Sequence, residues 1–365
     1  MTKRQRVGVI FGGRSVEHEV SITSARTVAR ALAEAGHEVV PLGVTPDGCW
    51  LDRELSRAAL DGRLDALPPQ GVPMMPTVGH LLGSGIEVAF PIVHGTWGED
   101  GTLQGLCEML DLPYVGAGVT ASALAMDKLQ CKRLLATAGV PVVEFVGFSA
   151  ADFDEDAAAC LSGADVLPLP LFVKPSIGGS SVGVQKVGRR EGLEPAVRHA
   201  LRFDDHVLIE RGIAGRELEC SVLGYRPLEA SAVGEIQPAA EFYDYADKYL
   251  DDAAGLVAPA ELDAAVEREV RRLAVAAFAA IGGWGMARVD FLLEGDTPYV
   301  NEINTVPGFT RISMYPRLWG VSGVPLPELV DRLVAVALER HGDRRRLDQG
   351  IKEWLQELAA KRSAG

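Results

Sequence analysis

The stretch ARVDFLLEGDTPYVNEINTVPGFTRISMYP, residues 287–316, decides how the rest of the chain is interpreted. Apolar and polar residues alternate on both sides of a central turn, which predicts a β-hairpin. A loop with an odd number of residues, about three, would place Asp290 opposite Glu302. The same register places Arg288 opposite Asn304, whereas a two-residue loop would put these partners on opposite faces.

The predicted register gathers two carboxylates, an amide oxygen and a guanidinium on one face of the hairpin. Hard oxygen ligands of this kind suit Mg²⁺, which takes further ligands from water and substrate phosphates. The arginine would lie where negative charge develops. A solvated hairpin face is the alternative, but the strands are apolar and lead into the turn 305–308, whose backbone could approach a ligand. The stretch therefore predicts a site for a metal–nucleotide complex.

The composition limits the possible partners. The 365 residues are enough for two or three domains, and 36 Lys and Arg against 50 Asp and Glu give a net charge of −14. Such a charge argues against a nucleic-acid or membrane partner, so any phosphate site must be built locally. The five cysteines form no CxxC motif and predict reduced thiols in a cytoplasmic protein. No signal peptide precedes Val7, and no apolar run approaches the about 18 residues of a membrane helix.

The first part of the chain predicts a doubly wound α/β sheet. An apolar strand at 6–11, a Gly-Gly turn, a helix and a second strand at 39–44 form a β-α-β opening. The turn is not GxGxxG, which weakens a dinucleotide interpretation. Glu19 stands at the helix start, where it is either a surface charge favoured by the helix dipole or a ligand-binding residue. Its place beyond the carboxyl end of a strand, where ligands bind in such sheets, favours the second interpretation. His94 ends the buried strand 87–93 and either packs in the core or contacts a ligand.

The middle of the chain carries a glycine- and serine-rich loop between two strands, residues 176–181. The arrangement strand–loop–strand, without GxxxxGK[ST], excludes a Walker A site. A hairpin loop of this kind holds phosphates with backbone N–H groups while a lysine, here Lys174, neutralises charge; a flexible surface turn is the alternative. Glu210 ends a further strand, and the backbone after it could hydrogen-bond an adenine edge.

The C-terminal part contains an aromatic segment and three expected helices. Residues 239–256 fit neither the helix nor the strand period, which is typical of a lid or binding loop. A long amphipathic helix is expected at 261–281, directly before the hairpin. Two helices are expected from Leu326 onward, with the three arginines at 344–346 as a solvated linker.

Together the motifs resemble the bacterial D-alanine–D-alanine ligases of the ATP-grasp superfamily along essentially the whole chain. The motifs are, in order, GGRSVEHEVS, HGTWGEDGTLQG, LPYVGAG, AMDK, VKPSIGGSSVGV, FYDYADKY, GMARVDF and NEINTVPGFTRISMYP. The resemblance implies an α/β, three-domain ATP-grasp architecture with an N-terminal doubly wound domain. The implied parts are 1–122 (N-terminal), 123–212 (central ATP-grasp) and 213–365 (C-terminal ATP-grasp, with lid loop 239–256 and metal hairpin 287–306).

The resemblance also implies an activity. In this family two D-alanines are ligated to D-alanyl-D-alanine through an acyl phosphate, and ATP gives ADP and phosphate for peptidoglycan synthesis. The implied cofactor is Mg²⁺ or Mn²⁺, with two ions per site. The implied partners are the small molecules D-alanine and ATP, with no nucleic acid or membrane, in a cytoplasmic homodimer.

The roles of single residues are implied by the same resemblance. Glu19 would hold the ammonium of the first D-alanine and link to Ser180, which would also link to the lid residue Tyr249. The implied catalytic residues are Glu19, Ser180, Tyr249 and Arg288. The implied ATP-binding residues are Lys128, Lys174, Gly178, Gly179, Ser180, Ser181, Val182, Glu210, Arg211, Gly212, Ile213, Glu217 and Lys248. The implied metal ligands are Asp290, Glu302 and Asn304. The implied substrate-binding residues are Glu19, His94, Arg288, Gly308, Ser313 and Met314.

The sequence departs from the family pattern at a few positions and leaves alternative functions open. Ile177, Gly178 and Gly212 stand where many relatives have polar or larger residues, which bears on nucleotide affinity. A ligase joining D-alanine to D-lactate or D-serine is one alternative, and Tyr249 favours the dipeptide. An inactive nucleotide-binding regulatory module is another, although every charged position of the implied site is filled. An NAD oxidoreductase fails for want of GxGxxG.

Overall fold

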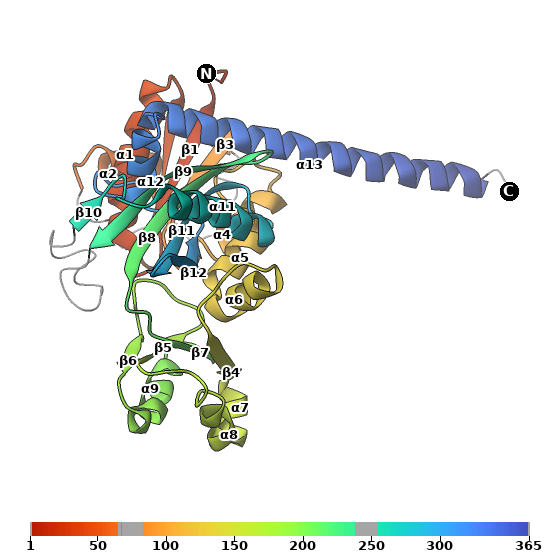
Figure 1. Ribbon diagram of the computed structural model, residues 1–365. Coiled ribbons are helices and arrows are strands. Elements are labelled where there is room, and N and C mark those ends of the chain that lie inside the picture. Colours follow the sequence, from red (N-terminus) through yellow and green to blue (C-terminus); the bar gives the residue numbers. More distant parts are fainter. Residues whose placement is uncertain (1, 65–66, 68–82, 238–254, 364–365) are drawn as a thin grey trace.

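The computed structural model describes residues 2–64, 67, 83–237 and 255–363. Its strands form a three-stranded, a four-stranded and a five-stranded sheet in this part of the chain. Figure 1 shows the four-stranded sheet and its helices as a separate lobe, while the other two sheets lie close together. Within the described ranges, no helix combines the length and the apolar character that crossing a bilayer requires.

The N-terminal sheet is parallel, with strand order β2-β1-β3. Its elements are β1 (Arg6–Gly12), α1 (His18–Glu34), β2 (Glu38–Val44), α2 (Arg53–Leu60), β3 (Val88–Pro91) and α4 (Thr102–Met109). β1 is buried from Val7 onward because apolar side chains cover both of its faces, as expected for a parallel strand. The carboxyl ends of β1 and β3 meet at one edge, which brings the loops after them together.

The four-stranded sheet is antiparallel in the order β4-β7-β5-β6. Its strands are β4 (Phe145–Ser149), β5 (Leu171–Pro175), β6 (Gln185–Val187) and β7 (His206–Arg211). The short helices are α7 (Ala150–Glu155), α8 (Ala157–Ser162), the 3-10 turn η1 (Arg190–Gly192) and α9 (Leu193–Ala200). Apolar residues of these helices and of β5 and β7 share one core, so the sheet has one covered face.

The five-stranded sheet is antiparallel in the order β10-β9-β8-β11-β12. Its strands are β8 (Arg216–Gly224), β9 (Leu228–Gln237), β10 (Gly255–Val257), β11 (Gly285–Glu294) and β12 (Thr297–Asn304). Its core includes α5 (Val119–Met126), α6 (Lys128–Thr137) and α11 (Ala264–Ala280). The expected central domain, residues 123–212, thus contributes α6 and the second half of α5 to the core of the C-terminal sheet.

β11 and β12 form the predicted hairpin, and Asp290 lies opposite Glu302 as predicted. The loop is nevertheless two residues long, because Glu294 pairs with Thr297. The register shifts by one residue after Asp290, and Asn301 is the extra residue of a β-bulge. The prediction of an odd loop was wrong, since the bulge supplies the odd residue that keeps the partners on one face.

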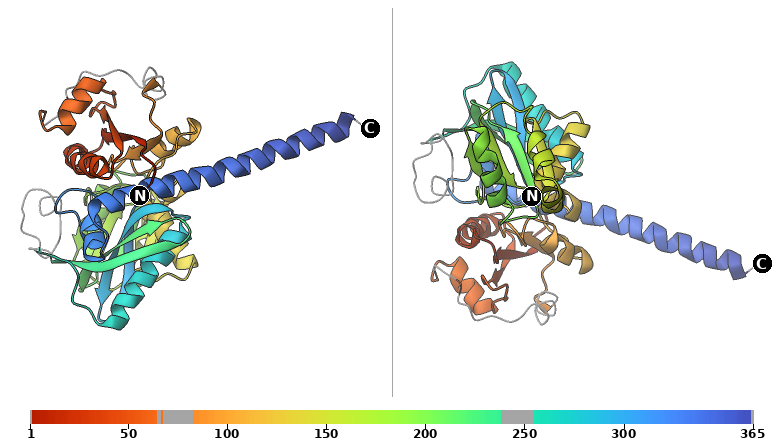
Figure 2. Two further views of the ribbon diagram at one scale, coloured as in Figure 1. Left: turned by 90° about the horizontal axis from the view of Figure 1, so that it is seen from above. Right: turned by 90° about the horizontal axis from the view of Figure 1, so that it is seen from below.

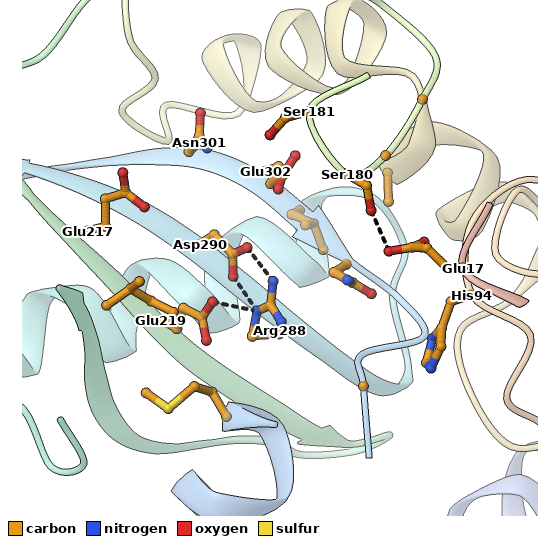
Figure 3. A pocket seen from close by; sticks show the side chains of 18 of the residues that line it. Glu17, His94, Ser180, Ser181, Glu217, Glu219, Arg288, Asp290, Asn301 and Glu302 are labelled. Carbon is orange, nitrogen blue, oxygen red and sulfur yellow. Dashed lines mark hydrogen bonds and ion pairs between the residues drawn. The ribbon is translucent and has the colours of Figure 1, made fainter. Parts of the chain in front are cut away.

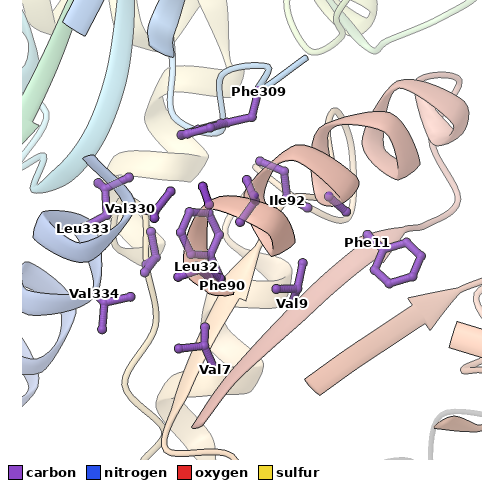
Figure 4. Close-up of a cluster of buried hydrophobic side chains, with 14 of the residues drawn as sticks. Val7, Val9, Phe11, Leu32, Phe90, Ile92, Phe309, Val330, Leu333 and Val334 are labelled. Atoms are coloured by element: carbon purple, nitrogen blue, oxygen red, sulfur yellow. The ribbon is translucent and has the colours of Figure 1, made fainter. Parts of the chain in front are cut away.

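The chain closes with α12 (Met314–Val321) and α13 (Leu326–Ser363), the latter a single helix of 38 residues. The first turns of α13 pack on the N-terminal sheet through Leu329, Val330, Leu333 and Val334, near Phe90 and Phe309 (Figure 4). Its second half extends away from the body in every view (Figures 1 and 2).

The expectation of two C-terminal helices joined by a linker was wrong. Arg344, Arg345 and Arg346 lie inside α13 and form ion pairs with Asp348, Asp111 and Asp343 respectively. Arginine is a good helix former, so the three arginines do not end the helix. Their ion pairs with neighbouring acids also offset the repulsion among the three positive charges.

Candidate active site

A cavity of about 1200 Å³ opens where the three sheets meet. Its walls come from the loops after β1 and β3, the loop after β5, strands β7 and β8, the β11–β12 hairpin and the start of α12. Figure 3 shows the acids of the hairpin and of β8 below the serine loop, with Glu17 and His94 at the right of the view. Segments far apart in the sequence therefore share one site.

The hairpin face carries a half-buried arginine between two carboxylates. Arg288 donates from Nε and Nη2 to the two oxygens of Asp290, both at 2.7 Å. Its Nε also lies 3.2 Å from Glu219 Oε1, because β8 pairs with β11 so that Glu219 stands opposite Asp290. Burial lowers the pKa of Arg288, but the carboxylates outweigh it and raise the pKa well above its ordinary value. The guanidinium is therefore a permanent positive charge aimed at the cavity.

The sequence analysis missed Glu219. It alternates with apolar neighbours on β8 as Glu217 does, and that alternation was the available signal. The register between β8 and β11 was needed to place it beside Arg288. With the predicted ligands Asp290, Glu302 and Asn304, it makes a donor set of oxygens only, which fits Mg²⁺ or Mn²⁺.

The serine loop is tied to the N-terminal domain through Glu17. Ser180 Oγ donates to Glu17 Oε1 at 2.6 Å (Figure 3). The predicted link from Ser180 to Glu19 was wrong, because Glu17 directly precedes α1 while Glu19 lies in its first turn with an exposed side chain. Glu19 still lines the cavity.

The serine loop itself has an unusual backbone. Ser180 and Ser181 adopt φ values of 51° and 59°, in the left-handed region. Residues other than glycine adopt this conformation at a cost of about 1–3 kcal/mol, and such strain is concentrated at functional sites. Consecutive N–H groups in a conformation of this kind form a concave surface that suits phosphate.

Two lysines meet one carboxylate at the cavity wall. Lys174 Nζ donates to Glu210, and Lys132 Nζ lies 3.0 Å from Glu210 Oε2, with the Lys132 and Glu210 side chains buried. Burial would raise the pKa of Glu210, but the lysines lower it to about 2. Lys132 was missed, although it lies one helical turn after Lys128 on α6. Lys128 Nζ donates to the carbonyl oxygen of Gly178.

His94 is both a packed residue and a wall of the cavity. Its Nδ1 donates to the carbonyl oxygen of Val306 at 2.9 Å, and its Nε2 accepts from Ser24 at 3.0 Å. Burial lowers the pKa of His94, with the Glu17 carboxylate acting in the opposite direction. The neutral ring thus joins the N-terminal domain to the turn that follows the hairpin.

The far end of the cavity is the start of α12. Ser313 precedes the helix and accepts a hydrogen bond from the Thr310 N–H at 2.9 Å. A Cβ at Gly308 would lie 2.7 Å from Ser313 Oγ, so a side chain here would displace the Ser313 hydroxyl. A helix N-terminus with free N–H groups favours a carboxylate.

The structure brings nearly all predicted residues in the described ranges to this cavity. Those that line it are Glu19, His94, Lys128, Lys174, Gly178, Gly179, Ser180, Ser181, Val182, Glu210, Arg211, Ile213, Glu217, Arg288, Asp290, Glu302, Asn304, Gly308, Ser313 and Met314. Gly212 lies just outside the lining, where a Cβ would meet Pro170 and Phe172 at 3.0 Å. Lys248 and Tyr249, with the predicted lid up to residue 254, lie outside the described residues.

Comparison with known proteins identifies the family. Residues 6–117 match the model "D-ala D-ala ligase N-terminus", and residues 134–335 match "D-ala D-ala ligase C-terminus". The D-alanine–D-alanine ligase of Mycolicibacterium vanbaalenii is 45% identical, over 93% of this chain and 99% of that protein. The ligase of Mycobacterium tuberculosis is 46% identical, over 93% of this chain and 96% of that protein.

Solved structures agree. The D-alanine–D-alanine ligase from Coxiella burnetii matches with a TM-score of 0.80 and 33% identity, over 97% of this chain and 100% of that one. The VanG D-Ala:D-Ser ligase from Enterococcus faecalis matches with a TM-score of 0.78 and 33% identity, over 92% and 100%. The likeness confirms the predicted α/β ATP-grasp architecture. The chain belongs to the D-alanine–D-alanine ligase family.

Proposed function

We propose that the protein joins two D-alanines to D-alanyl-D-alanine and converts ATP to ADP and phosphate, as a step of peptidoglycan precursor synthesis. The observation that carries the proposal is the cavity in which Arg288, the serine loop and the start of α12 converge. These three parts suit, in turn, an oxyanion, a phosphate and a carboxylate. The names of the relatives point to the same reaction.

In this proposal ATP binds between the four-stranded and five-stranded sheets. Glu210, Arg211 and Ile213 line the wall for adenine, and Glu217 lies where the ribose would reach β8. Lys128, Lys174 and the N–H groups of the serine loop neutralise the phosphates. When ATP binds, Lys174 would exchange its ion pair with Glu210 for one with the phosphates, while Lys132 keeps its ion pair with that carboxylate.

The residues present fit divalent metal ions. Asp290, Glu302 and Asn304 would hold Mg²⁺ or Mn²⁺, and two ions per site is part of the proposal. When bound, the metal screens the negative charge of the reacting phosphates. Arg288, whose positive charge is held by two carboxylates, stabilises the oxyanion of the tetrahedral intermediate.

The two amino-acid substrates would lie next to each other, because the amine of the second must reach the acyl phosphate of the first. An unactivated carboxylate is a poor acyl donor, so the carboxylate of the first D-alanine takes the γ-phosphoryl group of ATP as an acyl phosphate. Glu17, rather than the predicted Glu19, is the acid that we place beside the ammonium of this D-alanine, because it faces Ser180. The carboxylate of the second D-alanine would bind at Gly308, Ser313 and Met314.

The amine of the second D-alanine must lose a proton before it attacks the acyl phosphate. We assign the handling of this proton to Ser180 and Glu17, with Tyr249 of the lid segment. Closure of that segment, including Lys248 at the γ-phosphate, would exclude water from the acyl phosphate. A homodimer and a cytoplasmic location complete the proposal, and light scattering and cell fractionation would test them.

A D-alanine–D-serine ligase is the second candidate, because the VanG structure aligns over 92% of this chain. The two candidates share every step except the choice of the second substrate. The test is to incubate the protein with ATP, Mg²⁺ and D-alanine, D-serine or both, and to measure phosphate release and product mass. We expect D-Ala-D-Ala as the main product even in the mixture, and none with L-alanine. A mixed dipeptide as the main product would select the second candidate, and ATP binding without any ligation would indicate an inactive regulatory module.

A further inference from the structure

Glu99 is a buried carboxyl at the active-site cavity to which no role has been assigned above. It lies in the loop between β3 and α4, lines the cavity, and is 9% exposed. Its Oε1 accepts a hydrogen bond from the Gly95 N–H at 2.6 Å. Its Oε2 is buried and accepts no hydrogen bond among the described residues, since the nearby Val306 N–H donates to Asn304 Oδ1 at 3.2 Å. A buried polar atom left in this way costs free energy unless a ligand satisfies it.

A second carboxyl lies on the other side of the same glycine. A Cβ placed on Gly95 would lie 3.2 Å from Glu17 Oε2, so the Glu17 carboxylate approaches the backbone to which Glu99 is bound. Gly95 has a φ of +75°, which favours glycine here. Two acidic side chains from different loops are thus brought together at the end of the cavity that adjoins Ser180.

The charges around Glu99 are mostly negative. Burial, and then the Glu17 carboxylate, raise the pKa of Glu99 to about 8; Glu302 also raises it, and N–H groups of Gly95 and Val306 lower it only in part. The nearby cation Arg288 is already shared by Asp290 and Glu219, and the His94 ring is neutral. A cation beside the two carboxyl groups would stabilise both of them in the ionised form.

We propose that Glu99 is the second carboxylate of the pocket that binds the ammonium of the first D-alanine, opposite Glu17. The inference rests on the proposed function and adds a specificity-determining residue to it. An ammonium group has three donors, and Glu17 already accepts from Ser180. Glu99 Oε2 supplies a second acceptor with negative charge, which distinguishes an amino acid from a hydroxy acid of the same shape.

The test compares Glu99→Gln with the wild type and uses Asp100→Asn as the matched control. Gln keeps the side-chain length and an oxygen for the Gly95 N–H, but removes the charge. Asp100 lies in the same loop and accepts from the N–H groups of Trp97 and Thr102, so its amide variant changes the loop charge outside the ammonium pocket. Binding of D-alanine and of D-lactate is measured by ligand-dependent thermal stabilisation of the full chain with Mg²⁺ and ADP present.

We expect Glu99→Gln to weaken D-alanine binding about 10- to 100-fold and to leave D-lactate binding unchanged. The KM for D-alanine should rise, and the KM for ATP should stay within about twofold of the wild type and of Asp100→Asn. Unchanged D-alanine binding would overturn the inference. An equal loss for both ligands would also overturn it, because it would show that Glu99 only supports the Gly95 turn.

A second variant covers the case in which Glu99→Gln does not fold. Glu99→Asp keeps the negative charge but places it farther from the ammonium group, because the side chain is one methylene shorter. The preference for D-alanine over D-lactate should therefore fall, while D-lactate binding persists. An unchanged preference would overturn the inference. If the wild type itself makes no dipeptide, the proposed function fails. If the wild type makes the dipeptide but the Glu99 variants bind D-alanine as the wild type does, only this inference fails.

Discussion

Ser180 Oγ and Glu17 Oε1 form a hydrogen bond of 2.6 Å although the two residues are 163 positions apart in the chain. One end of the bond directly precedes α1 in the N-terminal domain, and the other is the left-handed loop after β5. The acid that would hold an amino-acid substrate and the loop that would hold a phosphate are thereby fixed relative to each other. Productive geometry between two substrates depends on such links.

The two acids at the start of α1 provide a matched pair of variants. Glu17→Gln should lower kcat/KM for D-alanine at least about 100-fold, because it removes the charge beside the ammonium and weakens the bond to Ser180. Glu19→Gln should stay within about threefold of the wild type, since that side chain is exposed. Steady-state kinetics of dipeptide synthesis measure both. The reverse order of effects would restore the sequence-based assignment to Glu19.

The bulge at Asn301 should not be needed to pair the site acids once the strand is one residue shorter. Deleting Asn301 would leave a regular two-residue hairpin in which Asp290 still lies opposite Glu302 and Arg288 opposite Asn304. We expect this deletion to retain measurable Mg²⁺-dependent ligation, because the carboxylates stay on one face. Asn301→Ala keeps the number of residues and should retain the register and measurable turnover. A deletion variant with a normal circular dichroism spectrum but no ligation would show that the bend at the bulge, and not only the register, controls the site.

The buried pair of Lys132 and Glu210 should support the fold. Lys132→Met should lower the free energy of unfolding by about 3–5 kcal/mol, because it leaves Glu210 with one partner fewer inside the protein. Urea denaturation measures this loss, and Lys186→Met, at an exposed lysine on β6, is the control. Loss of less than about 1 kcal/mol would mean that Lys174 alone compensates the carboxylate.

The same pair predicts a pH dependence. The pKa of Glu210 is lowered to about 2 in the folded protein, so its contribution to stability is fully present above the unfolded value of about 4.5. This contribution is lost as the pH falls from about 4.5 toward 2. The stability difference between the wild type and Lys132→Met should therefore shrink across this window. A difference that stays constant from pH 7 to pH 3 would contradict the assignment.

The outer half of α13 should contribute little to the fold. All side chains from Ile351 to Lys361 are exposed, whereas Leu333 is 1% exposed in the N-terminal core. Removing residues 351–365 should change the free energy of unfolding by less than about 0.5 kcal/mol and leave turnover unchanged. Leu333→Ala should cost about 2–5 kcal/mol. A large loss on truncation, measured by urea denaturation, would show that this half makes stabilising contacts.

Local pattern was enough to predict much of the site. Alternation predicted the hairpin strands and the pairing of Asp290 with Glu302, and the motifs predicted the serine loop and the cavity residues Gly308, Ser313 and Met314. The helix α12 that begins at Met314 was not predicted. The position of the bulge was not predictable, because strand period alone does not reveal where one residue is inserted. The loop length inferred from that period was therefore wrong.

The residues that sequence reasoning missed share one property: their partners lie far away in the chain. Glu219 meets Arg288 only through the register of β8 with β11, and Lys132 meets Glu210 only when α6 packs near β7. The choice between Glu17 and Glu19 depended on where α1 begins, which a sequence locates only to within a few residues.

The formation of an acyl phosphate is the central claim about the chemistry, and oxygen transfer tests it most directly. D-Alanine with ¹⁸O in both carboxylate oxygens is incubated with the protein, ATP and Mg²⁺, and the products are examined by mass spectrometry. If the carboxylate attacks the γ-phosphate, one ¹⁸O appears in the released phosphate for each dipeptide formed, and the other remains in the peptide carbonyl. Phosphate that carries no ¹⁸O would contradict the account, because the carboxylate would then have been activated without bonding to phosphorus.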